Sequence, residues 1–199
     1  GSYFEQSSTW YPERIKLLAV EQKLETTVMI PVGSEMWPVK MKGRIDRMDL
    51  KGESVLRIVD YKTGKVEKKD VKAGESLAET LQDKELKTKL FQLWMYKFLV
   101  KMELQKTPDD RIEPLKGLDS ERITIEPGII SFRNFKDQLI SSPLEFSEGE
   151  PETAFIQESN ALIKHWVDEL VSEETVFEKT ANLDQCTFCD FTSICHRNV

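Results

Sequence analysis

The segment from Lys42 to Lys65, KGRIDRMDLKGESVLRIVDYKTGK, constrains the fold most, because it reads as two strands that carry charged side chains to one place. Residues two apart in a strand share a face. One face of the second strand therefore carries Leu56, Ile58, Asp60 and Lys62. The opposite face is apolar apart from Arg57, which predicts a central strand of a sheet. An acid and a lysine buried at its end are costly unless they pair or bind an ion.

The preceding strand brings a further acid toward this pair. One of its faces is expected to carry Arg44, Asp46, Met48 and Leu50, and the connection through Lys51, Gly52 and Glu53 is typical of a hairpin. A hairpin lets Asp46 approach Asp60, and two converging carboxylates suit a hard divalent cation such as Mg²⁺. A nearby lysine can hold water or stabilise charge on a phosphate. The alternative is a structural ion pair between Asp60 and Lys62, with Asp46 as a surface acid.

The segments GRIDRMD and IVDYKTGK resemble the catalytic core of the PD-(D/E)XK nuclease superfamily, specifically the RecB-type and AddB-type exonuclease domains of bacterial helicase–nuclease complexes. The resemblance implies an α/β fold like that of restriction endonucleases, with a central mixed β-sheet flanked by helices. It implies that Asp46 and Asp60 bind Mg²⁺ or Mn²⁺ and that Lys62 is catalytic. It further implies that Glu21, in LLAVEQKL, supports the site; the alternative for Glu21 is an exposed strand acid.

A helical segment follows at the distance that this family leads one to expect. Apolar residues from Thr80 to Leu104 have helical spacing, and Gln92 and Tyr96 lie four residues apart, so they project from one face. The pair resembles the Q-x-x-x-Y motif of RecB-type domains, which implies that both residues contact the DNA strand. By spacing alone, a Gln and a Tyr on an amphipathic helix are ordinarily residues at the boundary of a core.

All three cysteines of the chain lie near its end, in QCTFCDFTSICHR. Thiolates spaced like Cys186, Cys189 and Cys195 are suited to binding an iron–sulfur cluster or a zinc ion, both of which are usually held by four ligands. The resemblance to AddB-type domains implies a 4Fe–4S cluster whose fourth cysteine lies upstream, so that the site is incomplete in this chain. The alternatives are zinc completed by His196, or three reduced cysteines without metal. Their odd number argues against disulfides and favours a reducing, cytoplasmic compartment.

Length and composition predict one domain. A chain of 199 residues with 39% hydrophobic content can bury one substantial core, so we expect a single nuclease domain over residues 1–199 with a cysteine-rich tail at 183–199. The leading Gly-Ser pair and the lack of an early histidine indicate an N-terminally truncated piece of a larger protein, since the family often carries a metal-binding histidine upstream. The segment from Thr107 to Ser120 is expected to be an exposed, disordered excursion. No apolar run is long enough to span a bilayer, so no membrane partner is expected.

The net charge of −7 is unfavourable for binding the phosphate backbone of DNA, which requires lysine and arginine. A nuclease can compensate by concentrating positive charge locally. The candidate patches are Lys62, Lys65, Lys68 and Lys69, followed by Lys84, Lys87 and Lys89. The alternative for both runs is a solvated face without a partner.

The function expected from these observations is that of a metal-dependent DNA exonuclease in repair and recombination. The preference for single strands and the helicase partner that delivers them come from the resemblance alone. Two alternatives remain open: a catalytically silent nuclease-fold module that binds DNA or assembles a larger complex, and a zinc-stabilised interaction domain.

Overall fold

The computed structural model describes residues 15–74, 76–83, 87–133, 139–142, 144, 154–176, 178–187 and 189–197. The chain divides into two compact units, residues 1–164 and 165–199, which are considered separately. Of the helices in the described part of the chain, none combines the length and apolar character needed to cross a membrane.

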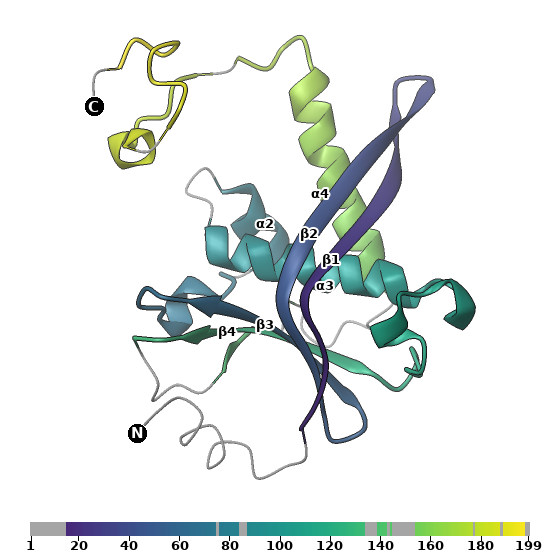
Figure 1. Ribbon diagram of the computed structural model, residues 1–199. Coiled ribbons are helices and arrows are strands. Elements are labelled where there is room, and N and C mark those ends of the chain that lie inside the picture. Colours follow the sequence, from purple (N-terminus) through teal and green to yellow (C-terminus); the bar gives the residue numbers. More distant parts are fainter. Residues whose placement is uncertain are drawn as a thin grey trace. The chain divides into compact units, whose positions relative to one another are not determined.

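A mixed β-sheet is the centre of unit 1 (Figure 1). Its strands, among the described residues, are β1 (Ile15–Val32), β2 (Glu35–Lys51), β3 (Val55–Lys62), β4 (Thr124–Ser131) and β5 (Ile140–Ser141). They lie side by side in sequence order. Only β3 and β4 run parallel, and the other neighbours are antiparallel. Together with the helices beside it, this sheet confirms the predicted α/β class and the central place of β3.

Two hairpins connect the first three strands, and each has a glycine in its turn with positive φ, 59° at Gly33 and 63° at Gly52. Glycine adopts this left-handed conformation without the steric cost that a side chain would impose. The predicted hairpin between the GRIDR and DYK strands is therefore confirmed.

Helices connect and cover the strands. They are α2 (Leu77–Gln82), α3 (Thr88–Leu104) and α4 (Ala154–Val171), with 3₁₀ turns at Lys68–Asp70, Pro108–Asp110, Glu113–Leu115 and Leu183–Cys186. Helix α3 lies in the crossover from β3 to β4 and contacts β1, β2 and β4 (Figure 1). The sequence predicts one helical segment from Thr80 to Leu104. The structure instead ends α2 at Gln82, where Asp83 is extended, and begins α3 at Thr88.

The main core lies between the sheet and α3. It contains Leu24, Ile45, Met48, Leu56, Ile58, Tyr96, Leu99, Val100, Leu104, Leu115, Ile123 and Ile125. The predicted face of β3 is confirmed, because Leu56 and Ile58 have no exposed surface. The predicted face of β2 agrees with the strand register, because Met48 pairs with Ile58 and Leu50 with Leu56. Burial along β2 is not confined to that face, since Ile45 and Met48 have opposite parity yet both are fully buried, while Arg44 is exposed.

The segment from Thr107 to Ser120 is also more ordered than its sequence predicts. Leu115 is fully buried in the core cluster. Arg111 is 6% exposed and donates hydrogen bonds to the carbonyl oxygens of Lys106, Leu118 and Leu104. A buried guanidinium that satisfies backbone carbonyls holds a polar loop in place, because these carbonyls would otherwise be left without partners.

The beginning of α4, within unit 1, is joined to α3 by polar and aromatic contacts. Trp94 is buried and its Nε1 donates to Ser159 Oγ at 3.1 Å. Lys97 Nζ lies 4.7 Å from the centre of the Phe155 ring, a cation–π arrangement. These contacts pack the beginning of α4 against α3.

Candidate active site

Asp60 and Lys62 end the central strand β3 as a close charged pair. Lys62 Nζ lies 2.8 Å from Asp60 Oδ2. Asp60 is 2% exposed, and the Lys62 side chain is 33% exposed. Burial raises the pKa of Asp60, because a carboxylate loses its hydration there, and the neighbouring ammonium of Lys62 partly opposes that rise. The pair therefore presents a buried acid and a cation that reaches the surface.

Asp46 is held beside this pair by the backbone of β3. Its Oδ2 accepts a hydrogen bond from Tyr61 N at 2.8 Å. The negative charge of Asp46 is a further cause of the raised pKa of Asp60, because two anions in proximity disfavour each other. The structure thus brings together the two carboxylates that the sequence places on neighbouring strands.

Gln92 of α3 connects both members of the pair. Its Oε1 accepts from Lys62 Nζ at 2.8 Å, and its Nε2 donates to Asp60 Oδ1 at 2.9 Å and to the Tyr96 hydroxyl at 2.8 Å. The amide orientation follows from chemistry, since a lysine only donates and a carboxylate only accepts. Gln92 consequently fixes the relative position of the acid and the amine, a role that the Q-x-x-x-Y resemblance did not indicate.

Tyr96 lies behind Gln92 and is 6% exposed. Burial raises the pKa of its hydroxyl, and the negative charges of Asp60, Asp46 and Glu21 raise this pKa further. The phenol is accordingly neutral at physiological pH. Gly43 makes room for it: a Cβ at that position would lie 3.2 Å from Tyr96 Cε1 and 2.9 Å from Leu99 Cδ1. The glycine of the GRIDR segment therefore permits the close approach of α3 to β2.

Glu21 lies opposite Asp46 across the β1–β2 pair, because Val20 pairs with Arg47 and Gln22 with Ile45. Its backbone φ is 52°, a conformation that is uncommon for a residue with a side chain and that collects at functional sites. The carboxylate is exposed and forms an ion pair with Arg44 at 2.7 Å. The sequence carries no signal for this backbone conformation. Glu21 thus lies at the edge of the cluster, with a basic side chain beside it.

The donor set around Asp60 fits a hard divalent cation. Asp60 Oδ2 is buried and forms no hydrogen bond with acceptable geometry, although the Lys62 ammonium lies near it. Among the described residues, no three His, Cys, Asp or Glu side chains lie close enough together to enclose a metal by themselves. Mg²⁺ commonly uses one or two carboxylates and keeps several waters, so the oxygens of Asp46 and Asp60 suffice for such an ion.

The lysine patches that the sequence predicts are partly neutralised. Lys65 and Lys69 both pair with Glu67, and the two ammonium groups lower the pKa of its exposed carboxyl to about 2. Lys89 pairs with Asp70 at 3.3 Å. Lys84 lies outside the described residues. Most of the positive charge after β3 is therefore already matched by acids of the same chain.

The three cysteines lie in unit 2 as free thiols. Cys189 N donates to the Cys186 carbonyl at 3.1 Å, which closes the Cys-x2-Cys turn. Cys186 is buried, and its Sγ accepts from Arg197 Nη1 at 3.4 Å. His196 is exposed and has a positive φ of 51°. In the part of unit 2 that the structure describes, these residues do not gather into a cluster of three metal ligands.

A mixed sheet whose central strand ends in a buried acid and a lysine, with a second acid on the neighbouring strand, defines an α/β protein with a nuclease-type site. The chain matches the family model of the PD-(D/E)XK nuclease superfamily over residues 3–196, and it belongs to that superfamily. Proteins of this superfamily are usually nucleases.

Other comparisons add little. No curated protein shows significant sequence similarity to the chain. One solved structure, described as the crystal structure of SSO0001, is 17% identical and has a TM-score of 0.34. The match covers 96% of this chain and 65% of that one, so the chain spans less than two thirds of its length. This likeness is too slight to inform the fold or the function.

Replacing Gln92 by alanine is expected to lower kcat about 10- to 100-fold with little change in KM, because Asp60 and Lys62 lose the amide that orients them. Steady-state cleavage of a labelled oligonucleotide measures both constants. Gln105→Ala, at the exposed end of the same helix, is the matched control and is expected to behave like the unaltered protein. A raised KM with unchanged kcat would instead make Gln92 a contact to the substrate strand.

Proposed function

We propose that the chain is a nuclease domain that uses Mg²⁺ or Mn²⁺ to hydrolyse phosphodiester bonds of DNA. The observation that carries the proposal is the arrangement of Asp46, Asp60 and Lys62, in which two carboxylates and an ammonium gather at the end of β3. In this reading, Asp46 and Asp60 hold the cation and Glu21 supports the site from the edge. When bound there, a divalent cation would supply stabilisation of the negative charge that grows on the phosphate.

Lys62 has the geometry to act on the substrate directly. Its ammonium donates to Gln92 Oε1 and lies 2.8 Å from Asp60 Oδ2 as an ion pair, and a lysine has three N–H donors. A donor that Gln92 does not use serves a water molecule or a phosphate oxygen, since this side chain is a third exposed. A fixed cation at this position favours charge that develops in the transition state and requires no reorganisation when the reaction occurs.

The substrate is proposed to be single-stranded DNA degraded from an end, delivered by a helicase subunit or domain during repair and recombination in the cytoplasm. Support comes from the order of three motifs that resemble the RecB-type and AddB-type domains, GRIDR, DYKTG and Q-x-x-x-Y. In that reading residues 1–199 are one nuclease domain of a longer protein, and Gln92 and Tyr96 also contact the DNA strand. Cys186, Cys189 and Cys195 then contribute to a 4Fe–4S cluster with a fourth, upstream cysteine, which iron analysis of the longer protein would test.

The experiment uses end-labelled single-stranded and double-stranded DNA with Mg²⁺, with Mn²⁺ and with a chelator. We expect degradation of the single strand in either metal and none with the chelator, while a circular single strand resists, as an exonuclease requires. Lys62→Ala is expected to cut about 10²- to 10³-fold more slowly, whereas Lys116→Ala, which removes a lysine paired with Glu113, is expected to be unaffected.

Each result separates the proposal from its alternatives. Equal degradation by the unaltered protein and Lys62→Ala would assign the activity to a contaminant or to another site. No degradation in either metal, combined with DNA binding, would make the chain a catalytically silent module. Cleavage of circular DNA would support the proposed nuclease activity but would contradict the proposal that the strand is degraded from an end.

A further inference from the structure

The β1–β2 hairpin extends beyond the rest of the sheet as a two-stranded arm (Figure 1). Only the stretch of β2 from Arg47 to Lys51 pairs with β3, whereas Glu35 to Ile45 pair with β1 alone. We call residues 22–45 the arm. One of its faces is buried, since Leu24, Val28 and Ile30 are 4%, 7% and 2% exposed. The opposite face is exposed along its whole length.

The part of the exposed face nearest the candidate site is basic. Lys23 pairs across the strands with Arg44, Glu25 with Lys42, and Thr27 with Lys40, so these side chains share one face. Four of the six are cations and one is an acid. The excess of positive charge is notable in a chain whose net charge is −7. This side of the arm therefore attracts an anion that the rest of the protein repels.

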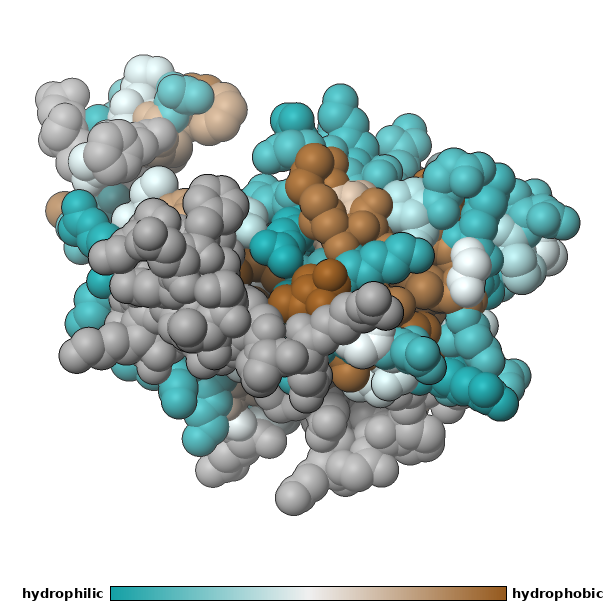
Figure 2. All heavy atoms as spheres, turned by 60° about the horizontal axis from the view of Figure 1, so that its bottom comes forward, coloured by the Kyte–Doolittle hydropathy of each residue, from teal (hydrophilic) through white to brown (hydrophobic). Residues whose placement is uncertain are grey.

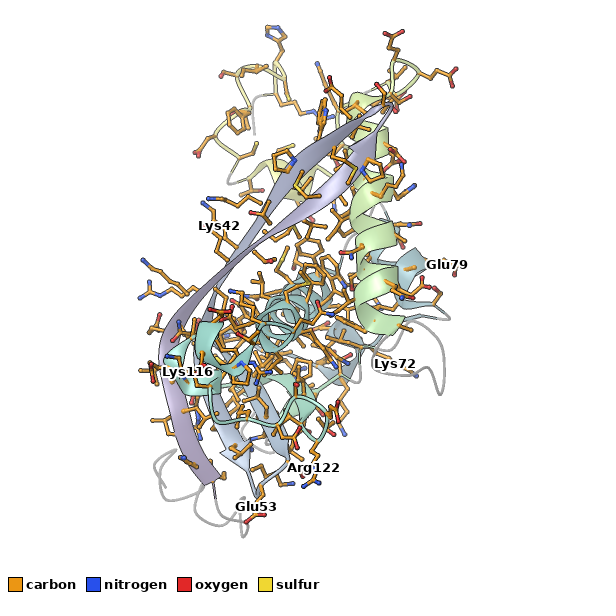
Figure 3. All side chains as sticks on the ribbon, turned by 90° about the vertical axis from the view of Figure 1, so that its right-hand side faces the viewer. Lys42, Glu53, Lys72, Glu79, Lys116 and Arg122 are labelled. Atoms are coloured by element: carbon orange, nitrogen blue, oxygen red, sulfur yellow. The ribbon has the colours of Figure 1, made fainter. Side chains whose placement is uncertain are left out.

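Two of these cations already have acidic partners, and two do not. Lys40 pairs with Glu25 at 2.9 Å and Arg44 pairs with Glu21 at 2.7 Å. Within the described residues, Lys23 and Lys42 form no ion pair. Both are exposed, and Figure 3 shows Lys42 pointing away from the ribbon of β2. Lys23 and Lys42 are consequently the side chains most able to bind phosphate.

The outer part of the same face is apolar. Met29 pairs with Pro38 and Pro31 with Met36, and the two methionines are 50% and 54% exposed. On the face of the molecule drawn in Figure 2, apolar side chains likewise reach the surface between hydrophilic ones. Prolines at a sheet edge prevent pairing with other strands. Exposed methionines give no such protection, and flexible apolar side chains are suited to contacting the faces of unstacked bases.

The basic stretch leads directly to the candidate site. One cross-strand step beyond the pair Lys23 and Arg44 lies Ile45 opposite Gln22, and the next step brings Glu21 opposite Asp46. The apolar tip, the row of cations and the carboxylates therefore follow one another along a single ribbon. From Glu21 to Pro31 the distance is roughly 33 Å at 3.3 Å per residue.

We propose that the exposed face of the arm binds the DNA strand that enters or leaves the site, with phosphates on Lys23 and Lys42 and bases against Met29 and Met36. Single-strand binding sites commonly combine a positive track for the backbone with platforms for the bases. This inference rests on the proposed nuclease function, since it places the substrate of that function. It predicts that a strand of about ten nucleotides covers the arm at the 3.4 Å spacing of stacked bases, and a shorter strand where the bases are unstacked.

Binding of fluorescent single-stranded DNA, measured by anisotropy with a chelator present so that no cleavage occurs, tests the arm. Lys23→Glu combined with Lys42→Glu is expected to weaken binding about tenfold or more and to reduce the slope of log affinity against log salt by about 1.4, the value for two lost phosphate contacts. The matched control, Lys116→Glu combined with Arg122→Glu, reverses two charges elsewhere on unit 1 (Figure 3) and is expected to leave both quantities unchanged.

Length dependence and crosslinking add independent readouts. An oligonucleotide of about four nucleotides is too short to reach from the site to the tip, so the arm variant is expected to bind it as well as the unaltered protein does. A photoreactive benzophenone amino acid in place of Met36 is expected to crosslink to a longer strand. The same group in place of Glu53, in the turn between β2 and β3, is expected not to crosslink (Figure 3).

The outcomes distinguish the arm from the nuclease. If the arm and control variants bind a long strand with equal affinity and equal salt slope, or if the unaltered protein does not bind single strands, the arm proposal is wrong. If the protein binds DNA through the arm but does not cut it in Mg²⁺ or Mn²⁺, the proposed nuclease function is contradicted and the proposal that the arm binds DNA is still supported. Unchanged melting temperatures would show that the surface variants are folded.

Discussion

Asp60→Asn is expected to cut DNA at least about 10³-fold more slowly than the unaltered protein, because the loss of one of two metal-binding carboxylates removes several kcal/mol of transition-state stabilisation. The shape of the site is largely kept, since the amide fills the same volume and its oxygen can accept from Gln92. Initial cleavage rates at saturating Mg²⁺ measure the effect. A variant within about tenfold of the unaltered rate would exclude Asp60 from the metal site.

The same substitution is expected to make the metal-free protein more stable at neutral pH. Burial raises the pKa of Asp60 above its ordinary value of 3.8, so the folded state holds this proton more tightly than the unfolded chain does. Folding stability consequently falls as pH rises from that ordinary value through the folded pKa, because ionisation costs more in the folded protein. Asparagine, which resembles the protonated acid, avoids this cost.

Melting temperatures with a chelator present, measured across a range of pH, test this second effect. The difference in melting temperature between Asp60→Asn and the unaltered protein is expected to vanish in acid and to grow toward neutral pH. It should amount to ~2–4 °C for each kcal/mol of difference in the free energy of unfolding. A difference of the opposite sign at neutral pH would show that the ion pair with Lys62 outweighs the burial of the carboxylate. A difference that is independent of pH would show that the two effects cancel, and it would equally contradict the expected result.

Asp49→Ala is expected to lower the free energy of unfolding by about 3–5 kcal/mol, although Asp49 is not part of the candidate site. Asp49 has no exposed surface and accepts from Arg57 Nε at 2.6 Å, while Arg47 Nε lies 2.7 Å from its second oxygen. Arg57 is 2% exposed. Removing this carboxylate takes away the charged partner that Arg47 and the buried Arg57 guanidinium share, which is costly for a buried cation.

Urea unfolding measures this loss. Glu113→Ala, which removes an acid that is 84% exposed and pairs with Lys116, is the control, and its effect is expected to stay within about 0.5 kcal/mol. A similar small effect of both substitutions would mean that the Asp49 cluster is not a source of stability. A large effect of Asp49→Ala without loss of cooperativity would agree with a buried pair.

The strands and the hairpin could be predicted because alternation and turn chemistry are local. Leu56 and Ile58 face the core as their spacing requires, and Gly52 takes the turn conformation. Hairpin register also explains Arg57, which interrupts the apolar face of β3: the register sets it opposite Asp49. The pairing of Arg57 with Asp49 can therefore be predicted from the sequence once the position of the turn is known.

Other features depend on tertiary contacts that no local pattern encodes. β2 buries side chains of both its faces around Asp46, Ile45 on one and Met48 on the other, where it leaves β3 and continues paired with β1 alone. The order of the loop around Arg111 comes from hydrogen bonds to the carbonyl oxygens of Leu104 and Leu118, seven residues before and after it. At the site, the sequence indicated which acids and lysine to expect, but the bridging of Asp60 and Lys62 by Gln92 required the placement of α3.

Binding of Mn²⁺, followed by titration calorimetry, tests most directly whether Asp46 and Asp60 share a divalent cation. The unaltered protein is expected to bind Mn²⁺, both Asp46→Ala and Asp60→Asn are expected to lose that binding, and Asp119→Asn, at an exposed turn, is expected to retain it. Equal Mn²⁺ affinity in all four proteins would contradict the assignment of the site.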